Sequence, residues 1–221
     1  MIELRDVALN APDGQPLLAG LDLAVPPGGN LLVTGPSGSG KSRLLKMIAG
    51  LESPAGGRVR VAGRDIWPGD GALGMAGRVR VGFAFASGGL LSNLSLAENV
   101  ALPLRFLGVP TAEVLARVRA ALKRLGLASV ASLRPHAVSA SARKHANLAR
   151  VLALAPELIL LDDPLEGLDA ADRAVVGELI QAWAADGSCT VVVAAEEADF
   201  YSHLEAARLQ LSHVPMSGGF E

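Results

Sequence analysis

The sequence predicts an α/β protein with a mostly parallel core sheet, an N-terminal antiparallel β subdomain and an inserted helical subdomain. Three observations lead to this fold class. Short alternating strands open the chain, a glycine-rich loop lies between an apolar strand and a helix, and strands alternate with helices near the end. The chain has 221 residues, of which 50% are hydrophobic, enough to bury the core of one large domain. We therefore treat residues 1–221 as a single domain, in which residues 87–140 form the helical subdomain.

The early strands are short and alternate between apolar and polar residues. We predict half-buried strands at residues 2–9, 21–25 and 57–63, bounded by turns rich in proline and glycine. Residues 30–34 form a nearly apolar run instead, which is typical of a buried strand. Residues 68–77 are glycine-rich and carry little periodic signal. The strands at the start of the chain therefore predict an antiparallel sheet around the glycine loop.

The middle of the chain changes from strand to helix. After a predicted strand at residues 79–85, the apolar spacing predicts a helix that Thr111 caps and that continues to Leu125. A further helix is predicted over residues 141–154, with arginines on one side. These helices make up or adjoin the inserted subdomain.

The last third alternates buried strands with a helix, which indicates a parallel α/β core. The predicted strands cover residues 157–163, 190–194 and 209–211. Asp169 is predicted to cap the helix after the first of these strands, and Gly187 to end it. Residues 215–221 are expected to form a loose tail.

One stretch matches the phosphate-loop pattern G-x-x-x-x-G-K-[ST] at every position: Gly35-Pro36-Ser37-Gly38-Ser39-Gly40-Lys41-Ser42. Glycines let backbone N–H groups converge on one point, and the helix that follows adds its positive N-terminal end. Lys41 is predicted to reach the β- and γ-phosphates of a nucleotide, and the Ser42 hydroxyl to hold Mg²⁺. Asp162, at the end of the apolar strand, is predicted to hold the same Mg²⁺ through its water shell.

Composition restricts the partners and the compartment. The net charge of −2 gives no bulk attraction to nucleic acid or to an anionic membrane. Cys189 is the single cysteine, which excludes an internal disulfide and a cysteine metal site. We recognise no signal peptide, and no apolar run approaches the ~18 residues of a membrane span. We therefore expect a cytosolic protein that does not bind nucleic acid and that only a partner could hold at a membrane.

Over essentially its whole length the chain resembles an ATP-binding subunit of ABC transporters. The matching stretches are Gly35–Ser42, Leu94–Leu104, Leu148–Ala153, Glu157–Pro164 and Gly167–Asp169. The resemblance implies that two such subunits, identical or different, pair head to tail and hold ATP and Mg²⁺ between them. One subunit would supply Gly35–Ser42 and Arg43, and the other the signature serine, Ser139. It also implies transmembrane permease subunits as partners and a peripheral position on the inner face of the cell membrane.

Several positions depart from that family pattern. Where the family has a glutamine and a histidine, this chain has Ala86 and Ala195. Ala140 and Ser141 replace the two glycines of the signature, and His145 replaces the arginine that follows it. Asp163 replaces the general-base glutamate. An early aromatic residue that stacks on adenine is also missing near Asn10-Ala11-Pro12. Alanine can contact neither Mg²⁺ nor the attacking water. We therefore expect nucleotide binding, with Asp163 as a weak candidate base and hydrolysis by a homodimer slow or absent.

Three functions remain open at this stage. The first is the ATP-binding subunit of an ABC transporter. The second is a non-hydrolysing structural or regulatory subunit that pairs with an active paralogue. The third is a soluble ATPase without a permease, which the absence of long insertions disfavours. Residues 87–91 followed by 98–100 further resemble the subfamily that moves phospholipids between bacterial membranes.

Overall fold

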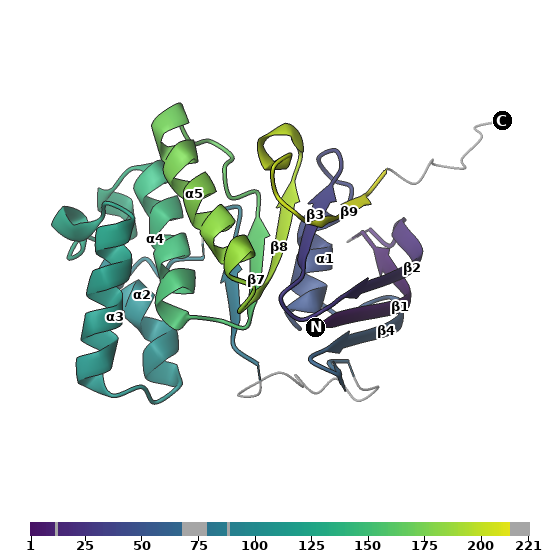
Figure 1. The fold of residues 1–221 in the computed structure, drawn as a ribbon, viewed down its shortest axis with the longest axis horizontal. Helices are drawn as coiled ribbons and strands as arrows, with labels where there is room; N and C mark the ends of the chain where they lie inside the picture. Colours follow the sequence, from purple (N-terminus) through teal and green to yellow (C-terminus); the bar gives the residue numbers. More distant parts are fainter. Residues whose placement is uncertain (12, 68–78, 88, 213–221) are drawn as a thin grey trace.

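The computed structural model describes residues 1–11, 13–67, 79–87 and 89–212. These residues form a four-stranded sheet, a five-stranded sheet and helices packed against them (Figure 1). The predicted α/β class, with one antiparallel and one parallel sheet, is confirmed. The glycine-rich segment at 68–77 and the predicted tail at 215–221 lie outside the described residues.

The smaller sheet has the strand order β2-β1-β4-β5, and its neighbouring strands are antiparallel. Its strands are β1 (Ile2–Asn10), β2 (Pro16–Val25), β4 (Gly56–Val61) and β5 (Arg64–Asp65). The strand predicted at residues 21–25 is longer than expected. It begins at Pro16 because the hairpin with β1 continues until Asn10 lies opposite Pro16.

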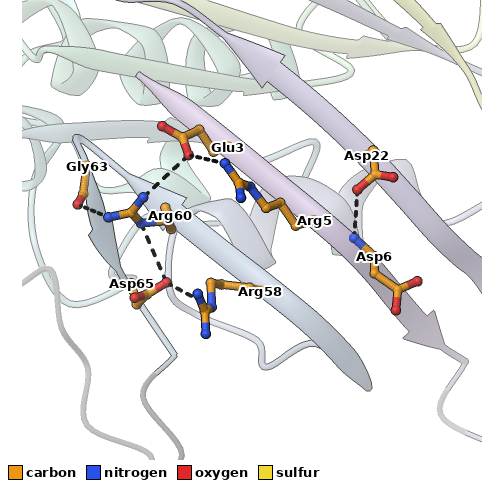
Figure 2. A network of polar contacts seen from close by, with 8 residues as sticks. All are labelled: Glu3, Arg5, Asp6, Asp22, Arg58, Arg60, Gly63 and Asp65. Carbon is orange, nitrogen blue, oxygen red and sulfur yellow. Dashed lines mark hydrogen bonds and ion pairs between the residues drawn. The ribbon is translucent and has the colours of Figure 1, made fainter.

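The outer face of this sheet carries a network of exposed charges (Figure 2). Arg60 lies 3.5 Å from Glu3 and 3.7 Å from Asp65. At Asp6, where φ is 49°, the register of β1 shifts, so that Val7 returns to the buried face. Exposed pairs of this kind contribute about 0–1 kcal/mol each. The exposed charges therefore contribute little to stability, while residues on the opposite face, such as Ile2, Leu4 and Val7, belong to the core.

The larger sheet has the order β6-β7-β8-β3-β9, and its neighbouring strands are all parallel. Its strands are β6 (Val81–Ala84), β7 (Leu158–Asp162), β8 (Thr190–Ala195), β3 (Asn30–Thr34) and β9 (Ala207–Gln210). Every residue of β7 and β8 is buried. A strand that is covered on both faces has no solvent-exposed face for polar side chains. For this reason β7 and β8 are nearly continuous apolar runs in the sequence.

Helices cover both faces of the parallel sheet, and one of them separates the two sheets (Figure 1). The helices are α1 (Lys41–Ile48), α2 (Leu96–Phe106), α3 (Thr111–Arg124), α4 (Ala140–Leu154) and α5 (Ala170–Asp186). Helix α1 packs between the sheets, where Leu158 and Leu160 of β7 join its core. Ile159 and Leu161 face the other way, into the core that α2 to α5 share. Within the described ranges, no helix is long and apolar enough to cross a membrane.

The capping residues predicted for α5 and α3 can be compared with the structure. Asp169 caps α5 as predicted, since its carboxylate accepts a hydrogen bond from the Asp172 N–H at 2.9 Å, and Gly187 ends the helix in the left-handed conformation. The prediction that Thr111 caps α3 is wrong. Thr111 is the first helical residue, and Pro110 precedes it without a side-chain cap. A proline with extended ψ turns the chain into the helix one residue earlier than the hydroxyl would.

Candidate functional site

The carboxyl ends of β3, β7 and β8 meet at one edge of the parallel sheet. Thr34, at the end of β3, pairs with Ala195 of β8, and Ala194 pairs with Asp162 of β7. The glycine loop begins directly after Thr34, so it starts at the same edge as Asp162 and Asp163. Ligands of open α/β sheets bind at the carboxyl ends of strands.

The glycine loop needs glycine for two different physical reasons. A Cβ on Gly35 would lie 2.4 Å from the Leu211 carbonyl oxygen, so a side chain there would collide with the strand end beside it. Gly38 and Gly40 have φ values of 80° and 96°, which residues with a side chain rarely adopt. The loop thus turns its backbone tightly onto the start of α1.

The Lys41 side chain folds back onto the glycine loop. Its ammonium donates hydrogen bonds to the carbonyls of Gly35, at 2.8 Å, and of Pro36, at 3.0 Å. The residue is only 5% exposed, although it is charged. The Ser39 hydroxyl is also buried and has no hydrogen-bond partner among the described residues. A buried cation and an unpaired hydroxyl on one glycine loop fit a phosphate group.

Ser42 and Asp162 bring two hard oxygen atoms together. The Ser42 hydroxyl donates to Asp162 Oδ1 at 2.8 Å, although 120 positions separate the two residues in the sequence. Burial raises the pKa of Asp162, while the bond from Ser42 and the charge of Lys46 act in the opposite direction. No cluster of three or more metal-ligating side chains exists among the described residues. A hydroxyl oxygen and a carboxylate oxygen placed together fit Mg²⁺ of the kind that takes its other ligands from phosphates and water.

Asp163 is held in a strained conformation beside this pair. Its φ is 41°, in the left-handed region that residues with a side chain seldom occupy. Its N–H donates to the Ala194 carbonyl at 2.9 Å, and its Oδ1 accepts the Glu196 N–H at 3.3 Å. Burial raises the pKa of Asp163, and the positive charge of Lys41 opposes that rise. A carboxylate with a raised pKa is a stronger base, which suits a role in accepting a proton.

Two alanines flank the aspartates. The backbone N–H of Ala86 acts on the Asp162 carboxyl and opposes the rise in its pKa, so the backbone of this residue lies at the site. Ala195 is 5% exposed and ends β8 beside the start of the glycine loop. Neither side chain can donate or accept a hydrogen bond. The edge that carries the two aspartates thus has alanine at the two positions where the resemblance led us to expect a glutamine and a histidine.

Ser139 and Arg43 make their contacts with residues outside this cluster. Ser139 caps α4 by accepting the Ala142 N–H at 3.1 Å. Arg43 forms an ion pair with Glu52. Both remain predicted nucleotide contacts, Ser139 toward the nucleotide of a paired subunit.

The first turns of α4 are tied to α5 through a single carboxylate. The Ser141 hydroxyl donates to Asp172 Oδ2, and His145 Nε2 lies 3.6 Å from Asp172 Oδ1. His145 is buried. Two of the residues that depart from the family pattern, Ser141 and His145, thus approach the same carboxylate.

Replacing Asp172 by alanine should lower the free energy of unfolding by about 1–2 kcal/mol, because it leaves the Ser141 hydroxyl without its acceptor. For a chain of this length that predicts a fall in Tm of about 2–8 °C in a calorimetric scan. Glu178→Ala on the exposed side of the same helix is the matched control and should leave Tm nearly unchanged. Equal melting of both variants would contradict the tie.

Sequence reasoning missed two groups that act on Asp163. One is the Glu196 N–H, a backbone group that no side-chain motif can reveal. The other is Lys144 of α4, whose ammonium donates to the Asp163 carbonyl at 2.9 Å and to the Glu166 carbonyl at 2.6 Å. The only signal in the sequence was the basic character of this helix.

Comparisons with known proteins agree with this geometry. A family model described as ABC transporter matches residues 18–166. The methionine import ATP-binding protein MetN of Caulobacter vibrioides is 38% identical over 204 residues, which cover 90% of this chain and 60% of the relative. The lipoprotein-releasing system ATP-binding protein LolD of Chromohalobacter salexigens is 33% identical over 201 residues, covering 90% of this chain and 85% of the relative. The chain thus spans about three fifths of the MetN relative and most of the LolD relative.

Solved structures give the same answer. The ATP-binding cassette MJ0796, solved as a dimer in a post-hydrolysis state bound to ADP and Pi, is 28% identical, with a TM-score of 0.86 over 100% of both chains. The protein cbiO1 from Clostridium perfringens, part of the ABC transporter complex cbiONQ, is 23% identical. It matches 96% of this chain and 86% of its own length with a TM-score of 0.76, which shows the fold alone.

Proposed function

Because this chain belongs to the ABC transporter family, we propose that it is the ATP-binding subunit of such a transporter, coupling ATP binding to transport across a membrane. In this proposal Gly35–Ser42 binds the phosphates, and Arg43, in the first turn of α1, is a further nucleotide contact. Ser42 and Asp162 hold Mg²⁺. Bound MgATP would supply a γ-phosphate that water can attack, and Asp163 is the candidate base.

The observation that carries this proposal is the 2.8 Å hydrogen bond between Ser42 and Asp162, beside the buried ammonium of Lys41. The loop residue and the strand-end carboxylate come from distant parts of the sequence. A glycine turn without a ligand would need neither a buried cation nor a buried carboxylate next to it, since burial of each charge carries a desolvation cost. Together they match the charge pattern of a magnesium nucleotide.

We expect the purified chain to bind MgATP but to release phosphate at less than about 0.1 per second, below the 1–10³ per second of ordinary enzymes. The reason is that Ala86 and Ala195 offer no polar group and that Asp163 is one methylene shorter than glutamate. A phosphate-release assay on the purified chain measures this rate, with Lys41→Ala as the background. A rate of about 1 per second or more above that background would contradict the prediction.

The proposed partners are a second ATP-binding subunit and transmembrane permease subunits. The dimeric state of MJ0796 supports pairing, and Ser139 would then face the partner's nucleotide. The permease would hold the chain on the cytoplasmic face of the cell membrane. Copurification of the tagged chain with membrane proteins tests this, whereas recovery of the chain alone from the soluble fraction would favour a soluble ATPase.

A second candidate function is a non-hydrolysing subunit that pairs with an active paralogue. Its support is the pair of apolar side chains, Ala86 and Ala195, that flank the two aspartates. If this holds, mixing the chain with an active paralogue should raise phosphate release above the sum of the separate rates. Transport of lipids stays a prediction from one short segment. The relatives are named for methionine import, lipoprotein release and pyoverdine export.

A further inference from the structure

Asp163 occupies a conformation that needs support from its surroundings. A residue with a side chain at φ 41° carries strain, and such strain persists only where neighbouring groups hold it. Two of these supports come from the end of β8, through the Ala194 carbonyl and the Glu196 N–H. They hold the amide and the carboxylate of Asp163. The Asp163 carbonyl accepts the Glu166 N–H at 3.2 Å, and its other lone pair can accept a second donor.

Lys144 supplies that donor from a different element. From the second turn of α4, its ammonium reaches the Asp163 carbonyl at 2.9 Å and the Glu166 carbonyl at 2.6 Å. The two carbonyls flank the turn that follows β7, in which the Glu166 N–H also donates to the Asp163 carbonyl at 3.2 Å. One side chain thus spans the turn from its first residue to its fourth.

The ammonium of Lys144 is half-buried, and charges of both signs lie near it. Burial lowers the pKa of Lys144, and the nearby carboxylates of Glu166, Asp163 and Asp162 act against that fall. The guanidinium of Arg173 is the neighbouring charge that adds to it. Hydrogen bonds from a charged donor are about twice as strong as those between neutral groups. A half-buried lysine on two carbonyls, facing three carboxylates, therefore acts as a fixed clamp on this turn.

We propose that Lys144 is a positioning residue that holds the strained peptide at Asp163 and so fixes the direction of the Asp163 carboxylate beside the phosphate loop. The proposal rests on the proposed function, because the carboxylate concerned is the candidate base. Lys144 acts through Asp163 and touches no reacting atom. Lys144 and Ala86 line one hollow of about 310 Å³ beside this turn.

Hydrogen exchange on the full chain tests the clamp without any turnover. Lys144→Met keeps the length of the side chain but removes the donor, whereas Lys144→Arg keeps a charged donor. Amides of residues 163–168 should exchange at least tenfold faster in Lys144→Met and within threefold of wild type in Lys144→Arg. Lys123→Met, at an exposed lysine of α3, is the matched control and should not change exchange in this segment. Wild-type protection in a folded Lys144→Met variant would overturn the proposal.

Where Lys144→Met does not fold, Lys144→Gln replaces it, because its amide retains one donor of shorter reach. The amides of residues 163–168 should exchange faster in that variant than in wild type, but more slowly than fully unprotected amides. Wild-type protection would again overturn the proposal.

Phosphate release separates the clamp from the proposed function. If Asp163 is the base, Lys144→Met should fall to the rate of Asp163→Ala with MgATP affinity within threefold of wild type, and Lys144→Arg should recover the rate. A Lys144→Met rate equal to wild type would overturn the positioning role. If wild type released phosphate no faster than Lys41→Ala, that result would count against hydrolysis by this chain. The hydrogen-exchange measurement would then test the clamp by itself.

Discussion

Lys41→Ala is expected to weaken MgATP binding about 100-fold. The Lys41 ammonium is the buried cation of the glycine loop, and in the bound state it would donate to charged phosphate oxygens. Two hydrogen bonds from a charged donor contribute about 1.5 kcal/mol each at the low end, or about 3 kcal/mol together. Since 1.4 kcal/mol is tenfold in a dissociation constant, this corresponds to roughly two orders of magnitude. Isothermal titration with MgATP measures the effect.

The control must separate lost binding from lost folding. Lys123→Ala removes an exposed lysine of α3 and should leave the affinity within about twofold, because exposed positions away from a site have small effects. Saturating MgATP should raise the Tm of wild type, since a ligand at 100 times its Kd stabilises the native state by about 2.7 kcal/mol. A Lys41→Ala variant that folds and still shows this shift at the same concentration would contradict phosphate binding by the loop.

The local parts of the fold were predictable because each depends on neighbours in the sequence. The glycine loop, the start of α5 at Asp169 and the buried run of β7 follow from patterns a few residues long. The Ser42–Asp162 contact spans 120 positions, and the sequence linked the two residues only through a shared Mg²⁺ site, which stays a prediction. The predictions of structure held where a short local pattern determines the element.

The support of Asp163 could not be predicted in the same way. An aspartate in the left-handed conformation looks like any other aspartate in the sequence, whereas a glycine at that position would have been a signal. The contact from Lys144 crosses from α4 to the turn after β7 and ends on backbone carbonyls, which carry no residue identity. Such contacts follow from tertiary packing, and only the folded chain reveals them.

Restoring the two lost groups together should raise the rate of hydrolysis about 100-fold. The double variant Asp163→Glu, Ala195→His returns a longer carboxylate and a polar ring to adjacent strand ends. Ala195 lies opposite Thr34, directly before the glycine loop, so an imidazole there would lie at the edge of the sheet where this loop begins. A misplacement of about 1 Å can cost ~10²-fold in rate, and a positioned base contributes 10²–10⁴-fold. An effect of about 100-fold is therefore the lower expectation.

The gain should depend on both changes and on an intact loop. Each single variant should recover less than the double variant, because the base and the ring act on the same water and are not additive. Adding Lys41→Ala to the double variant should return phosphate release to background, which shows that the new rate comes from this site. A double variant that binds MgATP as wild type does but hydrolyses no faster would contradict the assignment of Asp163 as a shortened base. The low rate would then have another cause, such as the start of α4 at Ala140 and Ser141, which in the proposed pair would face the partner's nucleotide.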